Sequence, residues 1–402
     1  MLFINIKKER KGDFLKAKIK LFITLICMVL TLNCFTYFSP DANTGIEPSE
    51  GKKKIVGYLP DWSYSFYKTM NFDELTHINI AFCNPDETGN LSCYIPDKEL
   101  NNIVEKAHSN NVSVLASLGG AGGSENYLEL VSGTEKINEF NKKILEYCKK
   151  YNFDGIDLDI EGEIEPEFWN YYEEWCVSLR KLCDENNLLL TNATAYWVSR
   201  HSSDKVYECF DFLNIMAYDN DVDPVSHSSY DYAVYCLDYF STSRGIPKEK
   251  LVLGVPFYGR GYIGDRTLDW SSYVPFSKII SQDSSYYQKD EFNGIEYNGA
   301  STMSAKCDLA KNYGGIMIWE ITQDAKGEYS LLTLISNKLR ESKNIIGDID
   351  GDGLIALRDC TYMIKYLHGT VEFTALEYKN ADMNSDGTIN IADLCMLKNY
   401  LI

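Results

Sequence analysis

Short apolar runs alternate with amphipathic stretches from residue 54 to residue 344. Most of the runs are rich in Val, Ile and Leu, which is typical of parallel strands buried on both faces. The runs are KIVGY (54–58), LTHINIAF (75–82), VSVLASL (112–118), GIDLDI (155–160), LLLTNAT (188–194), FLNIMA (212–217), LVLGV (251–255) and GGIMIW (314–319). Helical periodicity is found at 97–111, 133–152, 166–187, 228–240 and 327–339.

Alternating strands and helices predict a parallel sheet, and eight such units predict an α/β fold of the (β/α)8, or TIM, barrel type. An open doubly wound sheet is the alternative, but the phosphate-binding glycine pattern of many such folds is missing. In a barrel, active sites lie at the carboxyl ends of the strands. Polar side chains at those ends are therefore the candidates for chemistry.

The first 39 residues differ from the rest of the chain. They hold seven Lys and Arg against two Asp and Glu, and residues 21–40 contain no charged side chain. A basic stretch followed by an apolar run predicts an export signal over 1–39, with a retained membrane anchor as the alternative. The polar segment 40–53 predicts a linker. We therefore expect a secreted, extracellular protein whose barrel spans 54–344.

The chain is acidic, with a net charge of −19 from 39 Lys and Arg against 58 Asp and Glu. Nucleic acid binding requires a positive surface, so this balance argues against nucleic acid as a partner. Aromatic residues make up 13% of the chain, which suits stacking against sugar rings as well as core packing. Cys148, Cys176, Cys183 and Cys236 fall within predicted helices, and we expect them to be small buried side chains.

The fourth run, FDGIDLDIEGE, carries the candidate chemistry. Asp157, Asp159 and Glu161 stand at i, i+2 and i+4, so on a strand they point to the same side. The residues between them are apolar, as the helix-covered side of a barrel strand requires. Three carboxylates inside a barrel share protons, which raises the pKa of one of them and favours a general acid.

Three interpretations of these carboxylates compete. A solvated acidic strand end does not fit the apolar residues around them. A metal cluster is possible, but no His accompanies the three acids. Glycoside hydrolysis is the interpretation that we prefer.

DGIDLDIE (154–161) resembles the DGxDxDxE signature of glycoside hydrolase family 18, which includes chitinases and endo-β-N-acetylglucosaminidases. Other segments resemble the family in the same order. They are GYLPDW (57–62), LTHINIAF (75–82), SLGG (117–120), NIMAYD (214–219), GVPFYGRGY (254–262) and GGIMIWEITQD (314–324). About 50 residues separate GRGY from GGIMIW, which looks too short for the full α+β insertion that walls the groove of many family members. A shallower, more open cleft is therefore expected.

This resemblance implies substrate-assisted hydrolysis with retention, without a protein nucleophile. Glu161 would protonate the glycosidic oxygen, and the 2-acetamido oxygen of the substrate would attack the anomeric carbon. Asp159 would hold the acetamido nitrogen, Asp157 would share a proton with Asp159, and Tyr218 would stabilise the acetamido oxygen. The resemblance implies a substrate subsite formed by Tyr58, Phe82, Met216, Asp219, Tyr258 and Trp319. Ser117 and the glycines after it are interpreted as packing residues.

The C-terminal end carries a repeat. DIDGDGLIALRD begins at Asp348 and DMNSDGTINIAD begins 34 residues later, at Asp382. Both have oxygen-bearing side chains at positions 1, 3 and 5, Gly at 6 and a carboxylate at 12, which is the spacing of a calcium loop. The predicted ligands are Asp348, Asp350, Asp352, Leu354 and Asp359 in the first loop and Asp382, Asn384, Asp386, Thr388 and Asp393 in the second.

Two such loops, each followed by an amphipathic run, resemble a bacterial dockerin module over 345–402. The resemblance implies a small all-α domain that binds two Ca²⁺ ions and docks into a cohesin module of a scaffold or cell-surface protein. The whole chain is thus predicted to be a chitinase-like hydrolase that cleaves β-1,4 linkages of N-acetylglucosamine polymers and needs no catalytic cofactor. The alternatives are an endo-β-N-acetylglucosaminidase acting on N-glycans and a non-catalytic chitin-binding scaffold component.

Overall fold

The computed structural model of the chain describes residues 53–123, 126–161, 164–220, 226–264, 267–340, 345–350, 355–373 and 375–401. The predicted export segment 1–39 and nearly all of the linker lie outside these residues, as do the predicted calcium ligands Asp352 and Leu354. Among the described helices, none is long and apolar enough to span a membrane.

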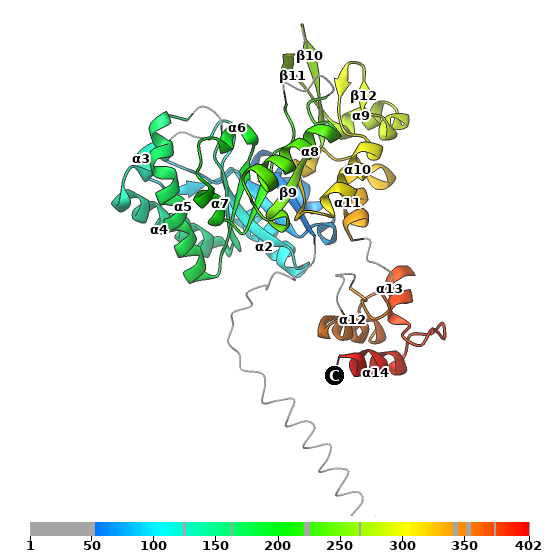
Figure 1. The fold of residues 1–402 in the computed structure, drawn as a ribbon. Coiled ribbons are helices and arrows are strands. Elements are labelled where there is room, and N and C mark those ends of the chain that lie inside the picture. Colours follow the sequence, from blue (N-terminus) through cyan, green and yellow to red (C-terminus); the bar gives the residue numbers. More distant parts are fainter. Residues whose placement is uncertain are drawn as a thin grey trace, which may run out of the picture. The chain divides into compact units, whose positions relative to one another are not determined.

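Eight parallel strands of the described chain close into a barrel, in the order β1-β14-β9-β8-β7-β6-β5-β2 (Figure 1). Each of the eight apolar runs supplies one strand, so the predicted barrel is confirmed. The strands are β1 (Lys54–Pro60), β2 (His77–Ala81), β5 (Ser113–Gly119), β6 (Gly155–Asp159), β7 (Leu189–Thr194), β8 (Phe212–Ile215), β9 (Leu251–Pro256) and β14 (Gly315–Trp319).

Helices follow the strands and cover the outside of the barrel (Figure 1). They are α2 (Asp97–Ser109), α3 (Tyr127–Val131), α4 (Thr134–Tyr151), α5 (Trp169–Asn186), α6 (Tyr196–Ser199), α7 (Asp204–Glu208), α8 (Tyr230–Asp238), α10 (Ala300–Ala310) and α11 (Leu331–Leu339). The five stretches with helical periodicity all contain a helix. The periodicity does not reveal α10, because this helix is rich in small residues and buries the charged Lys306.

The outward and inward faces of the strands are packed differently. Ile156 and Leu158 of β6 point outward and are fully buried in the large core between barrel and helices. A second cluster, which includes Val56, Phe212 and Met317, fills the inside of the barrel. Acidic side chains on the inward face of β6 are therefore surrounded by protein rather than water.

A small α+β unit is inserted after β9 (Figure 1). Its sheet has the order β11-β10-β13-β12. The elements are β10 (Tyr258–Ile263), β11 (Thr267–Pro275), α9 (Phe276–Gln282), β12 (Glu291–Phe292) and β13 (Ile295–Glu296). The length of this unit was underestimated in the sequence analysis. Its first strand, β10, contains the YGRGY motif, which we had counted as part of the barrel.

The segment after β2 forms a short hairpin of β3 (Asn84–Pro85) and β4 (Leu91–Ser92). Asn84 pairs with Ser92 and Pro85 with Leu91 in antiparallel register. The C-terminal part of the chain consists of α12 (Leu357–Leu367), α13 (Ala375–Ala381) and α14 (Ile391–Tyr400). This part has an apolar core of its own, which includes Ile349, Met363 and Leu397.

Candidate active site

The carboxylates of the fourth barrel strand lie where the alternation of β6 places them. Asp157 and Asp159 are buried inside the barrel, and Glu161 follows the end of the strand and is partly exposed. In the parallel register, Ser117 of β5 and Thr191 of β7 are level with Asp157. Polar side chains of both neighbouring strands therefore face this carboxylate.

Asp157 is fully buried and accepts hydrogen bonds from Tyr58, Ser117, Thr191 and Asn214. The Tyr58 and Ser117 hydroxyl oxygens lie 2.7 Å and 2.8 Å from Oδ2. Thr191 Oγ1 and Asn214 Nδ2 lie 2.5 Å and 3.2 Å from Oδ1. Burial raises the pKa of Asp157, and these donors act in the opposite direction because they favour the charged form.

The environment of Asp159 differs from that of Asp157. Its Oδ1 atom is buried and has no hydrogen-bond partner among the described residues. Burial first, and then the charges of Glu161 and Asp157, raise the pKa of Asp159 well above its usual range. Asp159 therefore favours its protonated form more than an ordinary aspartate does, while the hydrogen-bonded Asp157 is the better place for the negative charge.

Glu161 has a pKa suited to proton donation. Burial, followed by the negative charge of Asp219, raises the pKa of Glu161 to about 7. A carboxyl group of this kind is protonated in about half of the molecules at neutral pH, and it loses its proton readily when a better acceptor is present.

Two glycines bring the backbone of β5 against β6 and the cleft. Gly119 is level with Asp159 and has φ +113°, and a Cβ atom there would lie 2.1 Å from the Asp159 carbonyl oxygen. Gly120 has φ +81°, and a Cβ atom there would lie 2.4 Å from the Phe82 ring. The Gly120 N–H donates to the Asp159 carbonyl oxygen at 2.7 Å. The SLGG segment thus fixes Asp159 and leaves room for Phe82.

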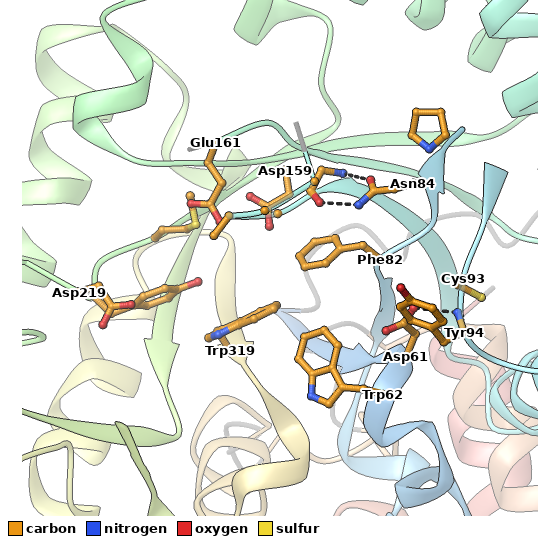
Figure 2. Close-up of a pocket in the computed structure, with 18 of the residues that line it drawn as sticks. Asp61, Trp62, Phe82, Asn84, Cys93, Tyr94, Asp159, Glu161, Asp219 and Trp319 are labelled. Carbon is orange, nitrogen blue, oxygen red and sulfur yellow. Dashed lines mark hydrogen bonds between the residues drawn. The ribbon is translucent and has the colours of Figure 1, made fainter. Parts of the chain in front are cut away.

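A cavity of about 960 Å³ opens above Asp159 and Glu161. In Figure 2, these two carboxyl groups lie along one side of the cavity, with Trp319 and Trp62 on the other. Phe82 stacks on Trp319 with ring centroids 5.8 Å apart, and Tyr58 meets Trp319 edge-on at 5.5 Å. The side chains of Trp62 and Trp270 also line the cavity and are 62% and 63% exposed. Flat apolar rings of this kind offer stacking surfaces to sugars.

Tyr218 and Asp219 lie in the segment that follows β8, on the cavity wall. The Tyr218 hydroxyl is 4.0 Å from Met317 Sδ, and burial raises the pKa of Tyr218 far above neutrality. Asp219 accepts hydrogen bonds from the guanidinium of Arg260. Burial opposes ionisation of Asp219, but hydrogen bonds from His227 and Arg260 outweigh it and lower the pKa of this carboxyl.

The structure separates the residues of the predicted subsite into two groups. Phe82, Met216, Asp219 and Trp319 line the cavity. Tyr58 and Tyr258 are buried behind it, where Tyr58 donates to Asp157 and Tyr258 stacks on Tyr273. Ser117, which we interpreted as a packing residue, donates to Asp157 instead. The sequence analysis did not find Thr191, Asn214, Arg260, Trp62, Trp197 and Trp270, which reach Asp157, Asp219 or the cavity.

The first of the two C-terminal loops brings three carboxylates together, and the acids of the second loop bind backbone N–H groups. In the first, carboxylate oxygens of Asp348, Asp350 and Asp359 lie within 4.8 Å of one another. Asp359 also accepts from the Ile349 and Ala356 N–H groups. In the second loop, Asp382 accepts from the Gly387 N–H at 2.8 Å and Asp393 from the Met383 N–H at 3.0 Å. Hard oxygen donors in this arrangement fit Ca²⁺.

A family model described as Glycosyl hydrolases family 18 matches residues 54–324, which is more than half of the chain. The chain belongs to glycosyl hydrolase family 18. It is a glycoside hydrolase, and the closed barrel is the family 18 fold. A second model, for the dockerin type I domain, matches residues 346–402 of this family 18 enzyme.

Solved structures agree with this assignment. The family 18 chain is similar to the chitinase ChiB of Flavobacterium johnsoniae, with 32% identity and a TM-score of 0.65 over 72% of this chain and 95% of that chain. A chitinase from Bacteroides thetaiotaomicron has 28% identity and a TM-score of 0.65 over 72% of this chain and 96% of that chain. Among curated proteins, Probable chitinase 2 of Drosophila melanogaster is 25% identical over 358 residues, which cover 68% of this chain and 72% of that protein.

Proposed function

We propose that this family 18 enzyme cleaves the β-1,4 linkages of N-acetylglucosamine polymers such as chitin, with retention of configuration and with the substrate acetamido group as nucleophile. The observation that carries the proposal is the row of Asp157, Asp159 and Glu161, which leads from the barrel interior to the open cavity. Relatives named chitinases, from Flavobacterium johnsoniae and Drosophila melanogaster, support the choice of substrate.

Glu161 acts as the general acid in this proposal. Its carboxyl group lines the cavity, and its pKa of about 7 keeps a proton available for the glycosidic oxygen. After the leaving group departs, the same carboxylate takes a proton from the incoming water. The nearby charge of Asp219 supports the first step, because it raises the pKa of Glu161.

Asp159 and Tyr218 hold the acetamido group of the substrate. The Asp159 Oδ1 atom has no partner among the described residues, so it is available to the acetamido N–H. The Tyr218 hydroxyl, also on the cavity wall, donates to the acetamido oxygen while that oxygen attacks the anomeric carbon. As positive charge develops on the acetamido group, Asp159 transfers its proton toward Asp157, because a negative charge on Asp159 then lies next to the developing positive charge.

Aromatic side chains bind the sugar rings. Trp319 forms the floor of the subsite that is distorted during the reaction, and Phe82 supports it from the side. Trp62 and Trp270, both exposed on the cavity wall, stack on neighbouring sugars. Met216 fills the remaining apolar side of the central subsite.

The enzyme is exported and attached to a scaffold or cell-surface protein through residues 345–402. The basic and apolar segment 1–39 supports export. Leu357 and Ile391 occupy equivalent positions at the starts of α12 and α14 and are 76% and 65% exposed, which supports docking into a cohesin module. Asp348, Asp350 and Asp359, whose carboxylate oxygens lie close together, would hold one Ca²⁺. By the spacing of the repeat, Asp382, Asn384, Asp386, Thr388 and Asp393 would hold a second.

A product analysis tests the proposed activity. Wild type, Glu161→Gln and the exposed α2 variant Glu105→Gln are incubated with N-acetylchitohexaose and with a high-mannose glycoprotein. Wild type and Glu105→Gln are expected to release chitooligosaccharides, and Glu161→Gln to lose nearly all of this activity. Release of high-mannose glycans without chitooligosaccharides would indicate an endo-β-N-acetylglucosaminidase. Equal activity in wild type and Glu161→Gln would refute the role of Glu161, and absence of activity in both would favour a binding protein.

A further inference from the structure

The β3–β4 hairpin brings two cysteines together on the cleft wall. Asn84 pairs with Ser92 and Pro85 with Leu91, so continuing the antiparallel register by one step puts Cys83 opposite Cys93. Directly opposite residues have Cβ atoms about 4.5–5.5 Å apart, and a disulfide needs about 3.5–4.5 Å. A small closure of the hairpin is therefore enough to join the two sulfur atoms.

The two thiols differ in access. Cys83 is fully buried, and its Sγ lies 3.8 Å from the Ile80 carbonyl oxygen. Cys93 is partly exposed and lines the substrate cavity, next to Tyr94 in Figure 2. The Tyr147 hydroxyl donates a hydrogen bond to Cys93 Sγ at 3.6 Å. A reagent in the cleft can thus reach Cys93 but not Cys83.

The electrostatic environment agrees with this difference. The Cys83 thiol lowers the pKa of Cys93 to about 7, with burial acting against it and the Tyr147 hydroxyl acting with it. Burial raises the pKa of Cys83 well above its usual range. Thiolates are the attacking species in disulfide exchange, so Cys93 reacts first.

We propose that Cys83 and Cys93 form a reversible dithiol–disulfide site on the wall of the substrate cleft, in which Cys93 reacts with low-molecular-weight disulfides and Cys83 resolves the adduct. Neither cysteine takes part in the hydrolysis described above. The site stands on the hairpin register and on the cleft geometry, so it does not depend on the substrate proposed for the enzyme.

The chemistry balances in two exchange steps with a small disulfide RSSR, such as oxidised glutathione. The Cys93 thiolate attacks one sulfur of RSSR, which forms a mixed disulfide and releases RS⁻. The Cys83 sulfur then attacks Cys93 Sγ, which forms the protein disulfide and releases the second RS⁻, and the Cys83 proton passes to this leaving thiolate while the first RS⁻ takes a proton from solvent. The protein loses two hydrogens, and the small disulfide is reduced to two thiols.

Closure of this disulfide would fix a loop that carries part of the cleft. Asn84, Asp86, Ser92 and Tyr94 of this segment line the cavity. Asn84 is already tied to the barrel, because its side chain exchanges hydrogen bonds with the Gly119 N–H and carbonyl groups at 2.7 Å and 2.9 Å. The disulfide would join the β4 side of the hairpin to this fixed side.

Mass spectrometry of the intact full-length chain tests the proposal. All variants carry Cys27→Ser, Cys34→Ser and Cys395→Ser. Cys395 is exposed and would form intermolecular disulfides, and Cys27 and Cys34 lie in the predicted export segment, outside the described residues. After incubation with oxidised glutathione, the parent chain is expected to lose two hydrogens and to yield a peptide pair joined through Cys83 and Cys93. Cys83→Ser is expected to stop at a stable glutathione adduct on Cys93, and Cys93→Ser to give neither product. A lasting adduct on Cys93 in the parent, or an identical outcome in both variants, would overturn the proposal.

A second measurement does not depend on the folding of any variant. The reduced parent chain is treated briefly with iodoacetamide and digested, and the labelled cysteines are identified. Cys93 is expected to be labelled many times faster than the buried Cys83 and Cys148, and labelling at Cys93 should block later disulfide formation. Labelling of Cys83 before Cys93 would contradict the assigned roles.

Hydrolysis provides a functional readout that rests on the proposed function. The bulky adduct that accumulates on Cys93 in Cys83→Ser should obstruct the cleft and lower kcat/KM for N-acetylchitohexaose, and reducing agent should restore it. The parent, which resolves the adduct, should keep its activity. An adduct that forms without loss of activity would contradict the proposal that the substrate binds in the cleft next to Cys93. The disulfide chemistry itself would remain supported.

Discussion

The guanidinium of Arg260 donates two hydrogen bonds to the carboxylate of Asp219, with Nε 3.0 Å from Oδ1 and Nη2 3.2 Å from Oδ2. Such a two-pronged contact stabilises the charged carboxylate. Arg260 is itself held by the Trp270 carbonyl oxygen at 3.0 Å and by the Tyr273 ring. Asp219 is therefore a fixed negative charge on the cleft wall, and this charge raises the pKa of Glu161.

Removal of that charge should shift the pH profile. A general acid must be protonated, so activity is expected to fall as the pH rises through the Glu161 pKa of about 7. Asp219→Asn removes the neighbouring charge, lowers the pKa of Glu161, and should move the basic limb of kcat/KM to lower pH by about one pH unit. The exposed variant Asp73→Asn serves as the control. An unchanged basic limb, or a shift to higher pH, would contradict the electrostatic role of Asp219.

The Glu161 carboxyl group should lower the free energy of unfolding as the pH rises above about 4.5. Below its ordinary pKa of 4.5, Glu161 is protonated in both the folded and the unfolded chain. Between 4.5 and about 7 the unfolded chain ionises and the folded chain does not, so stability is lost as the pH rises and stays lower above 7. Glu161→Gln should therefore raise the free energy of unfolding relative to wild type by about 2–4 kcal/mol at pH 8 and by much less at pH 4.5.

Denaturant unfolding of both proteins at the two pH values measures this difference. Other buried acids titrate in both proteins, so their contributions cancel in the comparison. A Glu161→Gln variant that is less stable than wild type at pH 8 would contradict the claim that the ionised Glu161 carboxylate destabilises the folded chain.

Loss of a donor to Asp157 should affect both folding and catalysis. Ser117→Ala removes the hydroxyl 2.8 Å from Asp157 Oδ2 and leaves a buried carboxylate with one partner fewer. We expect a loss of about 1–3 kcal/mol in the free energy of unfolding and a reduced kcat. Ser113→Ala, at the other end of β5, is the matched control and should leave kcat unchanged. Equal effects of the two substitutions on kcat and on the free energy of unfolding would show that Ser117 is a packing residue.

Much of the fold could be predicted from the sequence, because buried parallel strands leave a local pattern. The inward alignment of Asp157, Asp159 and Glu161 follows from the period of a single strand. The donors to Asp157 could not be found this way, since Ser117 and Thr191 reach it through the register between strands. The Arg260–Asp219 pair spans 41 residues and depends on how the inserted sheet folds back. Tyr58 and Tyr258 were placed in the subsite by the family resemblance, whereas each is buried behind the cavity.

Calcium removal should affect residues 345–402 and leave the barrel unchanged. EDTA is expected to unfold residues 345–402, because without the ion the carboxylates of Asp348, Asp350 and Asp359 repel one another at close range. Hydrolysis of soluble chitooligosaccharides should be unchanged, while binding to a cohesin partner should be lost. Circular dichroism, activity and pull-down assays on the same sample measure these effects. Loss of hydrolysis with EDTA would contradict the independence of the barrel, and readdition of Ca²⁺ controls for damage.

The most direct test of substrate-assisted hydrolysis compares two hexasaccharides that differ in the acetyl groups alone. Wild-type enzyme is incubated at pH 6 with fully N-acetylated chitohexaose and with its fully de-N-acetylated form, and initial rates are measured by chromatography. If the acetamido oxygen is the nucleophile and Asp159 and Tyr218 orient it, the acetylated substrate is cleaved and the de-N-acetylated one is not. Cleavage of both substrates at similar rates would contradict the mechanism.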